Sequence, residues 1–146
     1  MFQMRAQDFG IRVGSLPRGP RNKITDVPGV LVGHATVDTP THKTGVTVIL
    51  PGPQNPFTHK LPCQDFAEGD VGGGKGMICH GLKGGIGSAS RVLAFDGRTY
   101  TIGILVQSNH GVLSDLTVSG VNIGAGLART LETRAADQGS IIAVLA

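Results

Sequence analysis

Glycine constrains the fold of this chain more than any other residue, because 23 of its 146 residues are glycine. That share is about twice the roughly 7% that is usual in proteins. Because the glycines follow no G-X-Y period, a collagen-like helix is excluded. Such a chain folds with many tight turns, or with backbone segments that approach each other or a ligand closely. Hydrophobic residues make up 40% of the chain, which is too many for a disordered protein.

The residue pattern predicts strands rather than helices over most of the chain. Residues 30–34 and 46–50 are rich in β-branched residues and are bounded by turn residues. Pro28 and Gly29 suit the central positions of a type II turn. Residues 71–87 contain too much glycine for a regular helix. A proline-rich loop is expected over residues 51–70.

The clearest prediction of local structure falls in the second half of the chain. Two β-rich runs flank Asp96-Gly97, which predicts a hairpin. Residues 102–106 are apolar throughout, which predicts a central strand covered on both faces. Residues 127–136 are the one good helical candidate, and Gly139 is placed as its stop signal. Residues 140–146 read as a buried strand.

Charge and cysteine content narrow the class of protein. The net charge is +3, and the basic residues are scattered without a long run or interleaved aromatics, so no nucleic-acid partner is predicted. Two cysteines do not make a disulfide framework. Neither a signal-peptide pattern nor an apolar run of about 20 residues is present, so we expect no membrane association. The expected protein is cytoplasmic, with a single partial domain over residues 1–146.

The dipeptide Gly139-Ser140 is the first candidate for chemistry. If the peptide bond before Ser140 is cut, the freed α-amino group lies beside the serine hydroxyl and can act as its base. Glycine at the preceding position lets the hydroxyl approach the carbonyl that is attacked. The plain alternative is a serine at the start of a strand, after a helix-ending glycine.

Asn109 is the second candidate, at the end of the predicted central strand. An asparagine amide can donate a hydrogen bond to a developing oxyanion. The sequence Asn109-His110-Gly111 is also ordinary turn chemistry, which is the alternative reading.

The stretch from Gly69 to Gly76 imitates a phosphate-binding loop. Its glycine and lysine spacing fits that motif up to Lys75. Gly76 then stands where the motif needs a serine or threonine to bind magnesium, and no strand precedes it. Nucleotide binding is therefore a remote alternative.

Cysteines and histidines could form a metal site, but their spacing matches no metal motif. The chain has neither C-x-x-C nor H-x-x-x-H. We therefore predict no metal site. The possible ligands are His34, His42, His59, Cys63, Cys79, His80 and His110.

Taken in order, several segments resemble one family, the L-aminopeptidase/D-esterases, which include β-peptidyl aminopeptidases and nylon-oligomer hydrolases. The glycine-rich block is the most specific of these segments. The others are similar to the family's N-terminal signature, its next strand, its oxyanion-hole strand and its autocleavage site. The segments are residues 22–34, 44–51, 68–91, 100–111 and 139–142.

The resemblance implies an α+β fold, a four-layer αββα sandwich of the self-processing N-terminal-nucleophile type. It implies autocleavage between Gly139 and Ser140, with residues 1–139 as the α-chain-like part and residues 140–146 as the start of the β chain. Ser140 would then hydrolyse small peptides, amides or esters as an aminopeptidase, and Asn109 would stabilise the oxyanion. No metal or organic cofactor is implied.

The chain departs from the family in length. It has a short loop between Pro51 and Glu68 where relatives have a long segment, and relatives continue beyond Ala146. We therefore expect an incomplete, mostly β form of the sandwich. Its uncovered apolar faces would favour a homo-oligomer. The alternative to an active hydrolase is an inactive, truncated relic or structural fragment of the family.

Overall fold

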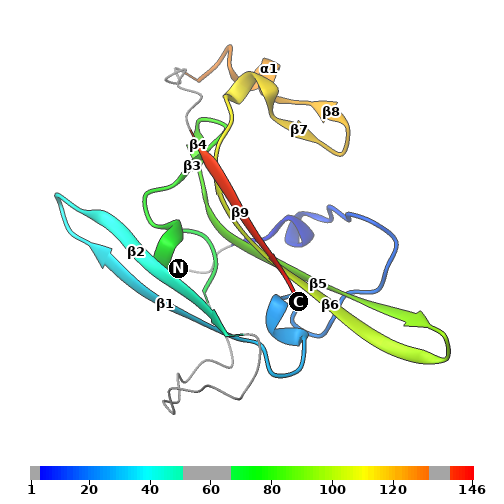
Figure 1. Ribbon diagram of the computed structural model, residues 1–146. Helices are drawn as coiled ribbons and strands as arrows, with labels where there is room; N and C mark the ends of the chain where they lie inside the picture. The colour runs from blue at the N-terminus through cyan, green and yellow to red at the C-terminus, as the bar shows by residue number, and fades with distance from the viewer. Residues whose placement is uncertain (1–3, 51–66, 132–138) are drawn as a thin grey trace.

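The computed structural model describes residues 4–50, 67–131 and 139–146, and in them the chain is mostly β-structure (Figure 1). The strands are β1 (Leu31–Asp38), β2 (Lys43–Leu50), β3 (Ile78–Cys79), β4 (Leu82–Lys83), β5 (Gly85–Phe95), β6 (Arg98–Asn109), β7 (Thr117–Val118), β8 (Val121–Asn122) and β9 (Ser140–Leu145). The helices are η1 (Ala6–Phe9), η2 (Ile24–Asp26), η3 (Gly72–Gly74), η4 (Leu113–Asp115) and α1 (Gly124–Leu127).

A three-stranded antiparallel sheet forms the centre of the molecule, in the order β5-β6-β9. The predicted hairpin at Asp96-Gly97 is confirmed, and it joins β5 to β6. Both loop residues have positive φ, 50° at Asp96 and 68° at Gly97, as a type I′ turn requires. This turn twists the two strands to match each other, so the long β5–β6 ribbon is fixed locally by its sequence.

The β1–β2 hairpin lies beside this sheet (Figure 1). Both expected strands are present, and each is longer than the apolar run that predicted it. The turn before β1 is also confirmed: the Val30 N–H donates to the Val27 carbonyl at 3.2 Å, and Gly29 has φ +88°. These are the features of a type II turn with Pro28 and Gly29 at its centre.

The hydrophobic core is small and covers one face of the central sheet. Its buried members are Ile24, Val30, Val32, Ile86 and Leu105. Ile24 is fully buried, and its backbone lies directly on β6 at Gly103, where any side chain would collide with it. The expectation that residues 102–106 are covered on both faces is wrong, because Ile102 is 40% exposed. Only the face that η2 covers is buried.

The expected buried strand at residues 140–146 exists as β9, but it is not buried. Ile141 is 59%, Ile142 55% and Leu145 71% exposed, while Val144 packs against the core. Composition is misleading here because β9 is an edge strand, and the described residues cover only part of it. The strand is held chiefly by its main-chain ladder to β6.

Half of the predicted helix over residues 127–136 lies outside the described part, at residues 132–136; of the described residues 127–131 only Leu127 is helical, as the last residue of α1, so the prediction is wrong there. Within the described residues α1 is the only α-helix, and it is only four residues long. The predicted proline-rich loop likewise lies largely outside the described part, at residues 51–66. The glycine-rich segment 71–87 forms no α-helix, as expected, and contains η3 and short strands instead.

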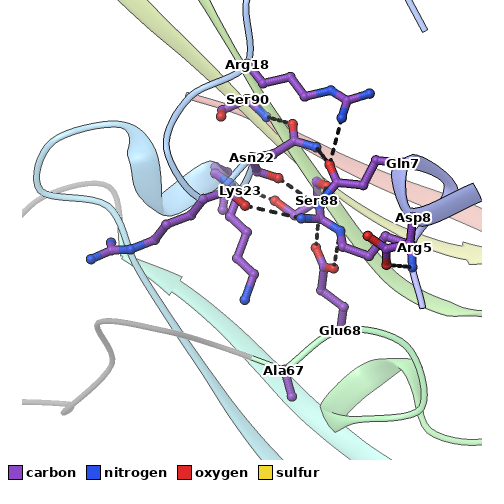
Figure 2. Close-up of polar contacts among 12 residues, drawn as sticks. Arg5, Gln7, Asp8, Arg18, Asn22, Lys23, Ala67, Glu68, Ser88 and Ser90 are labelled. Carbon is purple, nitrogen blue, oxygen red and sulfur yellow. Dashed lines mark hydrogen bonds and ion pairs between the residues drawn. The ribbon is translucent and has the colours of Figure 1, made fainter. Parts of the chain in front are cut away.

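The N-terminal arm is fixed to the edge of β5 by a network of polar contacts (Figure 2). The Arg5 guanidinium donates to the carbonyl oxygens of Asn22 and Ser88, at 2.8 and 2.5 Å, and pairs with Glu68 at 3.0 Å. A guanidinium directed at this many acceptors fixes geometry well. The arm, residues 4–23, is therefore held in place by these contacts. No helix among the described residues is long and apolar enough to cross a membrane.

Candidate active site

The structure brings together the two candidate catalytic residues, which are 31 positions apart in the chain. Ser140 is the first residue of β9 and Asn109 the last residue of β6, and they are directly opposite each other in the antiparallel ladder. Side chains of such a pair lie on the same face of the sheet, with Cβ atoms about 4.5–5.5 Å apart. The serine hydroxyl and the asparagine amide are therefore neighbours.

The face that they share is the covered one. Val144 is four pairs along the same ladder, opposite the buried Leu105, and successive side chains alternate between faces, so an even number of steps returns to the same face. Ser140 is nonetheless exposed, because it lies at the end of the ladder beyond the core. A hydroxyl in this position is open to a substrate and next to a polar, half-buried amide.

The Asn109 amide is oriented by the strand beside it. Its Oδ1 accepts a hydrogen bond from the Ile78 N–H at 3.1 Å. Because the oxygen of the amide is used in this way, the Nδ2 hydrogens are the part that can donate. An amide fixed at its oxygen is suited to stabilising a negative oxygen formed nearby.

Gly139 is required by a close approach of two backbones. A Cβ at this position would collide with the Asn109 carbonyl oxygen and would lie 2.7 Å from the His110 Cα. No other residue fits without moving β9 away from β6. The sequence suggested glycine here for access to the carbonyl, and the structure adds a second reason that sequence alone did not show.

The lysine of the segment that imitates a phosphate-binding loop is already paired. Lys75 is held between two carboxylates, with Nζ 2.6 Å from Asp38 and 2.8 Å from Asp70. Hydrogen bonds from Lys75 hold the pKa of Asp70 far below its usual range. Those with Asp38 and Asp70 raise the pKa of Lys75, so its charge is already compensated. The cluster instead joins β1 to the glycine-rich segment.

Sequence reasoning missed one buried polar group, Ser90. Ser90 is 1% exposed, and its hydroxyl donates to Asp26 at 2.6 Å. Burial tends to raise the pKa of Asp26, but hydrogen bonds from Ser90 and from backbone N–H groups outweigh it and leave the pKa lowered. Asn22 accepts from the Ser90 N–H at 3.1 Å. Asn22 and Asp26 lie in the segment that resembles the family signature, but nothing in the sequence indicated their contacts with Ser90, which is 64 or more positions away.

A shallow pocket of about 460 Å³ lies between the N-terminal arm and β5. Arg5, Asn22 and Glu68 line it, but they are already hydrogen-bonded to one another or to the backbone (Figure 2). This pocket therefore reflects how the arm is attached to the sheet.

Three of the seven possible metal ligands lie together. Cys79, His80 and His110 each offer one ligand atom, and these atoms are all within 4.8 Å of one another. His34 is engaged elsewhere, bonded to the Thr47 hydroxyl and the Ala67 carbonyl, and its burial lowers its pKa. His42 bonds its neighbour Thr41. His59 and Cys63 lie outside the described residues.

Solved structures with a similar backbone identify the class of protein. A protein from Pyrococcus horikoshii OT3 matches with a TM-score of 0.84 at 27% identity, over 97% of this chain and 67% of its own. A Burkholderia sp. beta-aminopeptidase matches with 0.83 at 28% identity, over 97% and 66%. The L-aminopeptidase D-Ala-esterase/amidase of Ochrobactrum anthropi, described as a variant of the Ntn hydrolase fold, matches with 0.69 at 24%, over 97% and 66%. The fold is therefore of the Ntn hydrolase type.

The family follows from the sequence comparison. The model of peptidase family S58 matches residues 22–64 and 60–146, and the chain belongs to this family. The resemblance found in the sequence is thereby confirmed.

Curated relatives match over shorter stretches. A beta-peptidyl aminopeptidase BapA of Sphingosinicella microcystinivorans is 48% identical over 94 residues, which is 55% of this chain and 24% of the relative. That of Sphingosinicella xenopeptidilytica is 57% identical over 58 residues, 40% of this chain and 14% of the relative. The matched part thus spans about a quarter or less of these relatives.

Proposed function

We propose that this chain is a hydrolase of the aminopeptidase or amidase type that is cleaved before Ser140 and then uses Ser140 as its N-terminal nucleophile. One observation carries the proposal: Ser140 and Asn109 are a directly opposed pair in the β6–β9 ladder. Membership of a peptidase family and a solved beta-aminopeptidase of similar structure support it.

Self-cleavage would begin at the Gly139 carbonyl. The Ser140 hydroxyl attacks this carbon, the C–N bond breaks, and the Gly139 acyl group passes from the nitrogen to the oxygen of Ser140. Water then hydrolyses the ester, which leaves a carboxylate on Gly139 and a free amine and hydroxyl on Ser140. Gly139 lies against the main chain of Asn109 at the end of β6, which supports a role for the Asn109 amide in stabilising the oxyanion.

Turnover of a substrate would repeat this chemistry between molecules. The free α-amine of Ser140 takes the hydroxyl proton as the oxygen attacks a small peptide, amide or ester. Asn109 donates from Nδ2 to the oxyanion while Ile78 holds its other end. The protonated amine gives its proton to the leaving group, and water releases the acyl product. No metal or organic cofactor takes part in these steps.

The four-layer αββα sandwich belongs to this proposal, with the described residues forming part of it. The bare face of the central sheet carries Ile102, Ile141 and Leu145, which are 40–71% exposed. Exposed apolar area of this kind is usually covered by another layer or another copy. We therefore propose a homo-oligomer with a small peptide or amide substrate and no nucleic-acid or membrane partner, in the cytoplasm.

The second candidate is an inactive relic, and the exposure of β9 favours it. After cleavage, residues 140–146 would be held by the β6 ladder and by Val144. Each such hydrogen bond contributes about 0.5–1.5 kcal/mol net. Loss of translational and rotational freedom costs about 4–15 kcal/mol. Residues 140–146 by themselves would therefore be held too weakly to keep the nucleophile in place.

Intact mass spectrometry separates the two candidates. Self-processing predicts a mass that lacks residues 140–146, and Ser140→Ala should restore the full mass. Ser114→Ala is the matched control, because Ser114 is also exposed and lies away from the ladder, so it should leave processing unchanged. Hydrolysis of aminoacyl-p-nitroanilides by the processed protein would then establish turnover. A full-length mass with no turnover would support the relic and contradict the enzyme.

A further inference from the structure

The cluster formed by Cys79, His80 and His110 has the composition of a metal site. Cys79 ends β3, His80 follows it, and His110 comes directly after β6. Their ligand atoms lie within 4.8 Å of one another. We propose that these three side chains bind a divalent transition metal ion of the zinc type. The inference is independent of whether Ser140 is a nucleophile.

The backbone holds His80 in an unusual conformation that directs it toward His110. His80 and Gly81 connect β3 to β4, and both have positive φ, 50° and 71°. A histidine in this left-handed region is uncommon. The His80 N–H donates to the His110 carbonyl at 2.8 Å. This bond fastens the β3–β4 turn to the end of β6, so the two segments that carry the ligands are joined at the main chain.

One ring nitrogen of His80 already has a hydrogen-bond partner. Its Nδ1 lies 2.9 Å from the Val112 carbonyl oxygen. A carbonyl can only accept, so Nδ1 carries the proton and Nε2 presents its lone pair. Metal-binding histidines commonly donate their other ring N–H to a carbonyl or carboxylate in this way. The protein itself therefore sets the His80 tautomer that leaves Nε2 available to a metal ion.

Gly111 makes room for that ring. A Cβ on Gly111 would lie 2.6 Å from both Cε1 and Nδ1 of His80. The ring thus lies against bare backbone, in a place that a larger residue would fill. Glycine, the left-handed turn and the hydrogen bond to Val112 all act on the same side chain.

The distance between Cys79 and His110 suits two ligands of one ion. The Cys79 Sγ is 4.0 Å from the His110 Nε2, which is long for a hydrogen bond between them. Around a tetrahedral zinc ion, with bonds of about 2.3 Å to sulfur and 2.0–2.1 Å to nitrogen, the two ligand atoms would be roughly 3.6 Å apart. A movement of a few tenths of an ångström would bring them to that separation.

The ligand set selects the kind of metal. A thiolate and two imidazoles favour zinc or a similar ion over magnesium or calcium, which take oxygen ligands. On binding, the Cys79 thiol releases its proton to solvent as the metal–sulfur bond forms. Three protein ligands leave one tetrahedral position for water. The alternative to a metal site is that the two histidines only pack against each other. Their rings are in edge-to-face contact, with centroids 5.3 Å apart.

Metal binding would also fix the neighbourhood of Asn109. Ile78 precedes Cys79 on β3 and orients the Asn109 amide, and His110 follows Asn109. An ion held by both segments would clamp β3 to the end of β6. The site is thus a stabilising clamp for this edge of the sheet.

Cobalt tests the ligand set directly, since Co²⁺ can replace Zn²⁺ and its absorption spectrum depends on which ligands bind it. Titrating the full chain with Co²⁺ should give a thiolate-to-cobalt charge-transfer band and the visible bands of a tetrahedral ion. Cys79→Ser should abolish the charge-transfer band, and Cys63→Ser, the matched control, should retain it. Absence of the band in the unsubstituted protein, or its survival in Cys79→Ser, would overturn the proposal.

Zinc affinity tests the histidines. His110→Asn should weaken Zn²⁺ binding by more than about 100-fold. Removing a residue that only hydrogen-bonds to a metal ligand already lowers metal affinity by about 10–100-fold, and loss of the ligand itself should cost more. His42→Asn alters a histidine outside the cluster and should leave the affinity unchanged. Far-UV circular dichroism checks that each variant is folded. If a variant does not fold, the cobalt spectrum of the unsubstituted protein still tests the proposal. Equal Zn²⁺ affinity in the folded His110 and His42 variants would refute the site.

Discussion

Strands β5 and β9 pair with opposite sides of β6, yet they are attached in different ways (Figure 1). On β5, Ile86 and Ser90 are 3% and 1% exposed, and the N-terminal arm and η2 lie against the strand. On β9, Val144 is the one residue that packs against the core. The first strand is thus held by packing and buried polar contacts, the second mainly by its main-chain ladder.

The residues that stabilise the fold and the candidate catalytic serine therefore lie on different sides of β6. The β5 side contains the buried residues that stabilise the described fold, and the β9 side contains the candidate nucleophile at an exposed strand end. A strand whose side chains contribute little to stability can change its covalent connection without unfolding the core. Substitutions on the two sides should therefore have very different effects.

The largest effect is expected for Ile24→Ala. Ile24 is fully buried between η2 and the β5–β6 ribbon, and removing such a side chain costs about 2–5 kcal/mol. The matched change Ile142→Ala, on a side chain that is 55% exposed, should alter the free energy of unfolding by less than about 0.5 kcal/mol. Denaturant titration measures both. Similar losses for the two variants would mean that β9 is covered and that the contrast is wrong.

A smaller effect is expected for Ser90→Ala on β5. The change removes a 2.6 Å hydrogen bond to Asp26 and leaves a carboxylate oxygen without that donor. A hydrogen bond to a charged group contributes about 1.5–3 kcal/mol net, and the backbone N–H groups of Arg21 and Lys23 still bond to Asp26. Ser114→Ala, at an exposed serine, is the control and should lie within about 0.5 kcal/mol of the parent. If the two variants melt alike in calorimetry, the Asp26–Ser90 contact does not stabilise the β5 side.

The smallest effect concerns the β1–β2 hairpin, which is attached to the glycine-rich segment by charge. Ion pairs with lysines hold the pKa values of Asp38 and Asp70 below their usual range. The unfolded chain therefore binds more protons than the folded chain near the usual Asp pKa of about 3.9. The pairs should stabilise the fold above this pH and lose that contribution as pH falls further.

Asp70→Asn should flatten this part of the pH profile, since it removes one of the two carboxyls that hold Lys75. Unfolding midpoints measured across the acid range at low salt give the profile. The residual slope should persist, because the lowered pKa of Asp26 makes a contribution of the same sign. An unchanged profile would show that these exposed pairs contribute nothing to stability.

Local chemistry made part of this structure predictable from the sequence. The Asp96-Gly97 hairpin and the Pro28-Gly29 turn depend on φ preferences of one or two residues, and both form as expected. The resemblance to the aminopeptidase family rested on short segments in the right order, and the family match confirms it. The positions of Asn109 and Ser140 were read from the same segments, while their roles remain predictions.

Burial and proximity could not be predicted in this way. The apolar composition of residues 140–146 indicated a buried strand, but exposure depends on what lies over the sheet. Cys79, His80 and His110 match no metal-binding spacing, because a strand pairing and a left-handed turn bring them together. Ser90 gave no signal, since its partner Asp26 is 64 positions away.

The turns, the β-rich character and the family could thus be predicted from the sequence, because each follows from local backbone preference or from short ordered motifs. The folded structure was needed to show which face of the sheet is covered, that Ser140 is opposite Asn109, and that one cysteine and two histidines lie together. These are contacts between distant residues, and their geometry is set by strand register and packing rather than by the residues next to them in the chain.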